Sequence, residues 1–232
     1  SMANTKQTYL NKTIKLDENL LPEDINILKT FNIIVINNFD TNKITKQKYD
    51  VLKKWVNDGG LLLVGTGQAH VKTLAMFKDN FMEKELKGVS SINTKAINQF
   101  TEGQSSQSSF KLDALNIDIK DTQSAVKDGD KILVHKLDRG KGVLAIASFD
   151  FGLNPLAGWS LNNSFSEKLL SVLLPAYYND GTYDIIANKA GHSSFNSYML
   201  QNIPELPIPK TTRLIVIFFI YILIVGPLNY LI

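Results

Sequence analysis

Cysteine is absent from the 232 residues of this sequence. Its absence excludes disulfide bonds, metal or iron–sulfur centres held by thiolates, and any cysteine nucleophile. Histidine is scarce, and the three copies, His70, His135 and His192, lie too far apart for the spacings of a typical zinc site. The formal net charge of +3 is too small to indicate nucleic-acid binding, and a hydrophobic content of 44% is too high for a disordered chain. We therefore expect no metal, no cofactor and no nucleic-acid partner.

Charge is missing altogether from the last stretch, residues 214–232, which reads LIVIFFIYILIVGPLNYLI. At about 1.5 Å per residue, a helix of this length spans roughly 28 Å, close to the hydrocarbon thickness of a bilayer. The run predicts a transmembrane helix over residues 213–232 and a lipid bilayer as its partner. The positions that we assign to the membrane contact are Arg213, Tyr221, Gly226, Pro227 and Tyr230. The alternative is a helix buried in a protein core, although such helices usually carry a polar face.

The flanking segments have a different composition from the rest of the chain. Residues 1–20 read as an N-terminal extension that opens with a cloning remnant, Ser1-Met2, and residues 179–212 read as a juxtamembrane linker rich in proline, glycine and asparagine. The chain stops directly after the apolar run, so we interpret it as a fragment of a larger membrane protein. The folded domain is then expected within residues 21–178.

A strand–helix–strand pattern opens this domain. Residues 32–39 and 61–67 are apolar runs typical of buried strands, and residues 45–60 place apolar side chains at helical spacing before a Gly-Gly stop. Two strands joined by a helix with short connections predict parallel pairing, with the helix packed outside the sheet.

The second half of the domain reads as strands with one closing helix. Residues 72–87 suggest a less regular helix ended by Gly88, residues 89–130 a β-rich insertion, and residues 131–151 a β-hairpin with a central second arm. A capping box at Ser164 to Glu167 predicts a helix that begins there. The expected fold is a three-layer α/β sandwich with a mainly parallel sheet.

Three blocks of sequence carry a resemblance to a known family. They are the strand–helix–GG–strand–GTG block over 32–67, the stretch RGKGVLAIASFDFGLNPLAGW over 139–159, and the membrane entry over 203–232 with its GPLNY motif. The sequence resembles the class I glutamine amidotransferase-like domains found in extracytoplasmic parts of bacterial membrane proteins, mostly from Firmicutes. The resemblance implies a flavodoxin- or amidotransferase-like fold, a place at the cell membrane with the soluble domain outside the cytoplasm, and an envelope or transporter protein as partner.

The sequence departs from this family at the reacting residue. Class I amidotransferases use a cysteine on the turn after a central strand, whereas the corresponding turn here reads Gly65-Thr66-Gly67-Gln68. Glutaminase activity by the family mechanism is therefore excluded, because thiolate attack needs the sulfur. The resemblance then implies a binding module that has lost the reaction of its family.

Polar residues nevertheless follow several of the predicted strands, where ligands bind in open α/β sheets. This candidate crevice comprises Asp40, Thr66, Gly67, Gln68, His70 and Asp150. A hydrolase that uses Asp40, Thr66 and His70 is one alternative to the binding module. The other is a structural spacer or assembly domain, in which the two aspartates cap turns and Thr66 makes a local hydrogen bond.

Overall fold

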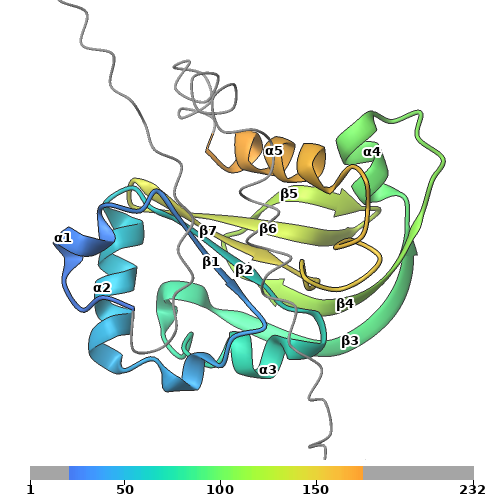
Figure 1. Ribbon diagram of the computed structural model, residues 1–232. Coiled ribbons are helices and arrows are strands. Elements are labelled where there is room, and N and C mark those ends of the chain that lie inside the picture. Colours follow the sequence, from blue (N-terminus) through green and yellow to red (C-terminus); the bar gives the residue numbers. More distant parts are fainter. Residues whose placement is uncertain (1–20, 175–232) are drawn as a thin grey trace, which may run out of the picture. The chain divides into compact units, whose positions relative to one another are not determined.

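The computed structural model describes residues 21–174 and shows a five-stranded sheet with helices on both faces (Figure 1). The predicted extension 1–20, the linker 179–212 and the predicted transmembrane helix 213–232 lie outside the described residues. Among residues 21–174, no helix has both the length and the apolar character that crossing a membrane requires.

The strand–helix–strand unit is confirmed. Strand β1 (Ile33–Asn37) pairs in parallel with β2 (Leu61–Gly65), and α2 (Lys46–Asn57) connects them. The hydroxyl of Thr45 accepts a hydrogen bond from the backbone N–H of Lys48 at 3.3 Å and so caps the start of α2. Short α1 (Ile25–Leu28) and η1 (Thr41–Lys43) flank β1.

The predicted hairpin is also confirmed, and its second arm lies at the centre of the sheet. Strand β7 (Gly142–Ala147) pairs in parallel with β2 and antiparallel with β6 (Lys131–Arg139), which pairs antiparallel with β5 (Gln123–Asp128). The strand order is β1-β2-β7-β6-β5. The α/β class is thus confirmed. The sheet is mixed: β1–β2 and β2–β7 pair in parallel, as predicted, whereas β5 and β6 enter through tight turns and pair antiparallel.

The expected helix over 72–87 is wrong. The structure has only α3 (His70–Thr73) and the 3-10 turn η3 (Asn80–Met82) before β3 (Lys84–Thr94) begins. Leu74, Phe77 and Phe81 are buried as expected, yet the Asp79 carboxylate accepts from the Phe81 N–H at 3.2 Å and closes a turn instead. Gly88, expected to stop the helix, has φ +90° within a bulge of β3.

Strand β3 pairs antiparallel with β4 (Phe110–Ile119), and together they form a separate two-stranded sheet, called here the β3–β4 ribbon. Two further helices are α4 (Ala96–Glu102) and α5 (Asn162–Leu173). The capping box misplaced the start of α5 by two residues: the helix begins at Asn162, whose side-chain oxygen accepts from the Ser166 hydroxyl at 3.4 Å.

Two apolar clusters cover the two faces of the five-stranded sheet. Along β2, Leu62 and Val64 belong to one cluster and Leu61 and Leu63 to the other, as strand alternation requires. Helices α1 and α2 lie over the first face, while α4 and α5 lie over the second (Figure 1). The domain therefore has three layers, namely helices, sheet and helices, and the β3–β4 ribbon lies outside this arrangement.

Candidate functional site

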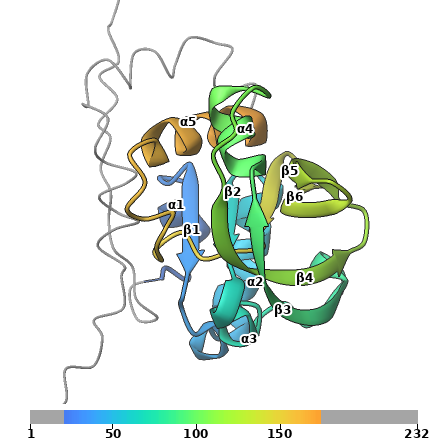
Figure 2. The ribbon, with the colours of Figure 1, turned by 90° about the vertical axis from the view of Figure 1, so that its right-hand side faces the viewer.

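The β3–β4 ribbon passes over the carboxyl ends of β2 and β7, where the candidate crevice was expected (Figure 2). The backbone N–H of Leu115 donates to the carbonyl of Ser148 at 2.7 Å, and the Gln68 amide donates to the Asp113 carboxylate at 3.3 Å. On either side of this crossing, β4 contributes to different clusters: Phe110 and Leu112 to one face of the sheet, and Leu115, Ile117 and Ile119 to the other. Strand β4 therefore closes this part of the sheet edge.

Beneath the ribbon, the turn after β2 is bonded to the chain that follows β7. Thr66 is fully buried, its hydroxyl donates to the carbonyl of Ala147 at 2.7 Å, and its N–H donates to Phe149. Gly67 has φ +60°, and a Cβ there would lie 3.2 Å from the Asp113 carbonyl oxygen. The turn is packed too closely for a larger residue, and the hydroxyl of Thr66 is already used.

A second set of bonds joins the ends of β1 and β7 across β2. We call Asn37, Gly65 and Asp150 the strand-end clasp. The Asn37 amide donates to the Asp150 carboxylate at 2.7 Å, and its oxygen accepts from the N–H of Phe151 at 3.1 Å. Gly65 leaves room for this side chain, because a Cβ there would lie 2.1 Å from the Asn37 oxygen. The sequence interpretation missed Asn37; the available signal was the pair of asparagines, Asn37 and Asn38, that follows the apolar run.

The other predicted site residues make local contacts. The Asp40 carboxylate accepts from the N–H of Asn42 at 3.1 Å and caps η1. His70 places Nδ1 at 3.0 Å from the carbonyl of Gly67, which makes Nδ1 the protonated nitrogen. Over residues 21–174, no hydrogen bond joins His70 to Asp40, Thr66 or Asp150, and no group of histidine and carboxylate side chains could hold a metal.

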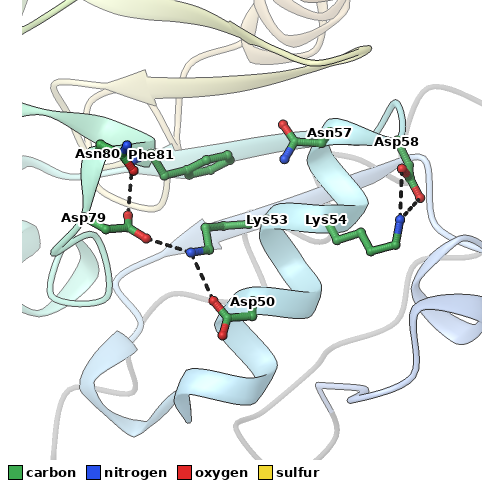
Figure 3. A pocket seen from close by; sticks show the side chains of 8 residues that line it. All are labelled: Asp50, Lys53, Lys54, Asn57, Asp58, Asp79, Asn80 and Phe81. Atoms are coloured by element: carbon green, nitrogen blue, oxygen red, sulfur yellow. Dashed lines mark hydrogen bonds and ion pairs between the residues drawn. The ribbon is translucent and has the colours of Figure 1, made fainter.

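A groove that the sequence did not predict lies between α2 and the segment around η3 (Figure 3). Its volume is about 480 Å³, and its lining residues are Asp50, Lys53, Lys54, Asn57, Asp58, Asp79, Asn80 and Phe81. Lys53 lies 2.7 Å from Asp79 and 3.0 Å from Asp50, and Lys54 lies 3.2 Å from Asp58. Opposite charges are thus paired within the groove, which favours a tie between two elements over a site for a charged ligand.

The electrostatics of this groove centre on Asp79. Burial alone would raise the pKa of Asp79, but hydrogen bonds from Lys53, Tyr49 and the Phe81 N–H outweigh it and hold the pKa below its usual value. The Tyr49 hydroxyl donates to Asp79 at 2.8 Å, and burial together with this carboxylate raises the pKa of Tyr49. The group is a neutralised, hydrogen-bonded tie between α2 and η3.

Comparisons with known proteins found similar structures but no similar sequence family. No protein-family model matches the sequence, and no curated protein matches it. Two cytoplasmic proteins of Salmonella typhimurium are similar in structure at 15% identity each, over 66% of this chain and 76% and 75% of theirs, with TM-scores of 0.48 and 0.46. An exo-beta-1,4-mannosidase from Opitutaceae bacterium strain TAV5 is similar over 63% of this chain and 26% of its own, at 15% identity and a TM-score of 0.39. At these TM-scores the likenesses carry no conclusion about function.

Proposed function

We propose that this chain is a membrane-tethered module with a degenerate amidotransferase-like fold, held outside the cytoplasm of a bacterial cell. It binds a ligand or a protein of the envelope or transport machinery and catalyses no reaction. The observation that carries the proposal is the closed sheet edge: β4 crosses the ends of β2 and β7, and the polar groups below it are bonded within the protein.

A hydroxyl nucleophile needs an accessible oxygen with a base within hydrogen-bond reach. Thr66 is 0% exposed and donates its proton to the carbonyl of Ala147. His70 directs one ring nitrogen to the carbonyl of Gly67, and Asp40 accepts from Asn42. These bonds favour a structural role for the three side chains over a hydrolytic one. The membrane part of the proposal rests on the charge-free run 214–232.

Hydrolysis assays test the absence of catalysis. We expect the whole protein in lipid nanodiscs to hydrolyse neither glutamine nor simple esters above the rate of empty nanodiscs. Thr66→Ala and His70→Ala should leave that background unchanged. Turnover by the unsubstituted protein that disappears in both variants would contradict the proposal and favour the hydrolase.

Thiol labelling tests the location, because the chain without cysteine gives no background. Lys46 lies on α2 with 89% of its side chain exposed, so Lys46→Cys places one accessible thiol on the domain. In intact cells that express the whole protein, a membrane-impermeant maleimide should label this variant. Labelling only after the cells are permeabilised would place the domain in the cytoplasm and overturn this part of the proposal.

A further inference from the structure

His135 is buried between the sheet and the β3–β4 ribbon. It lies on β6 opposite Ile146 of β7, and opposed residues share a face of the sheet. Ile146 belongs to the cluster that contains Leu115 and Ile117 of β4, so His135 lies on the face that this half of the ribbon covers. Its side chain is 2% exposed.

The surroundings of the His135 ring suit only its neutral form. Nδ1 lies 3.4 Å from the Thr122 hydroxyl, and Nε2 is buried without a hydrogen-bond partner. Protonation would place an N–H and a positive charge where no acceptor meets them, which is costly in a protein interior. Burial accordingly lowers the pKa of His135 to about 4.

Charged groups near the ring do little to compensate. Asp118 of β4 favours the protonated form of His135, but its effect is smaller than that of burial, which opposes protonation. Its carboxylate is ion-paired with Lys87 of β3. The residue opposite His135 on β5 is Ser124, which is uncharged like Ile146 on β7. The adjacent Lys136 pairs with Ala145 of the other cluster and so faces away.

We propose that His135 makes the docking of the β3–β4 ribbon sensitive to acid, so that its protonation releases the ribbon and uncovers the carboxyl ends of β2 and β7. The closed form excludes the proton and the open form accepts it. Between the ordinary histidine pKa of about 6.5 and the value of about 4 in the closed form, each unit of acidification favours the open form about tenfold. The sheet edge beneath the ribbon is then accessible in acid and covered at neutral pH.

Single cysteines in the whole protein test this inference. Ser148→Cys places a fully buried thiol where β4 crosses the sheet, and Ala145→Cys places one in the sheet beneath the other apolar cluster. For each variant, the rate of labelling by dithiodipyridine is divided by the rate for the exposed Lys46→Cys variant. For Ser148→Cys this ratio should rise about tenfold for each unit by which the pH is lowered from 6.5 to 4.5. Ala145→Cys should stay protected.

The histidine substitution separates this effect from general acid unfolding. Adding His135→Leu to Ser148→Cys should remove the acceleration, whereas adding His70→Ala, at a half-buried histidine of α3, should keep it. Acceleration that survives His135→Leu, or equal acceleration of Ala145→Cys, would overturn the inference. A readout without substitution is the NMR titration of the His135 ring, for which we expect a pKa well below 6.5. A ring that titrates at 6.5 or above would also overturn it.

Discussion

Gly65 shows how one missing side chain can organise a sheet edge. The Asn37 amide reaches Asp150 across β2 only because Gly65 carries no Cβ. The contact with Asp150 also orders the chain after β7, since its carboxylate accepts from the N–H of Gly152 at 2.7 Å. The clasp therefore joins the ends of β1 and β7 across β2 through one amide and one carboxylate, and a hydrogen bond to a charged acceptor is stronger than a neutral one.

Gly65→Ala is expected to lower the free energy of unfolding by about 1–3 kcal/mol, because the new methyl group overlaps Asn37 and lies 2.9 Å from the Phe151 ring. Chemical denaturation measures the loss. Gly129→Ala is the matched control: it faces open space and bears only the backbone cost of φ +57°. Combined with Asn37→Ala, the Gly65 substitution should cost less than the sum of the two single losses. Strict additivity would argue against the clasp.

The elements of this fold differ in how far local sequence determines them. The β1–α2–β2 unit follows from apolar runs, a threonine cap and a glycine stop, all of which act within a few residues. Local sequence mispredicts the segment after α3. Its apolar spacing fits a helix, but the Asp79 carboxylate accepts a hydrogen bond from the Phe81 N–H and closes a turn. The crossing of β4 depends on contacts such as Gln68 with Asp113, which no local pattern contains. The structure places the candidate residues after the ends of β1, β2 and β7, where the sequence predicted them, but the cover by β4 and the role of Asn37 were not predictable.

At the same scale, Asp79 ties η3 to α2. Asp79→Ala should lower the free energy of unfolding by about 1 kcal/mol at pH 7. This is a small value for the loss of a charged hydrogen-bonding group, because the Asp79 side chain is 36% exposed and solvent screens its charge. The pKa of Asp79 is lower in the folded protein than in the unfolded chain. Its contribution to the free energy of unfolding is therefore complete at a pH above the unfolded pKa, and it disappears as the pH falls through the folded pKa. Denaturation at pH 7 and pH 3 measures both effects. Tyr49→Phe, which removes one hydrogen bond and keeps the Lys53 pair, should cost less; an equal cost would contradict this account.

For the whole molecule, our proposal makes residues 214–232 a membrane anchor, and this part of it can be tested directly. We expect the unsubstituted protein to remain with membranes after carbonate extraction. Leu223→Lys places a charge at the centre of the run and should release much of the protein, because a central lysine opposes insertion by about 3 kcal/mol. Val71→Lys, at a 71% exposed position of the domain, adds the same charge and should release none. Equal behaviour of the two variants would exclude residues 214–232 as the anchor.

The place of β7 has a consequence for synthesis on the ribosome. Strand β2, buried along its whole length, pairs on one side with β1 and on the other with β7, whose Ala147 lies opposite Gly65 about 80 residues later in the chain. At typical elongation rates of 5–20 residues per second, the nascent chain carries an exposed apolar strand edge for roughly 4–16 s before its partner emerges. Such an edge invites pairing with other chains, so we expect a chaperone that covers this edge during that interval to reduce aggregation of the domain.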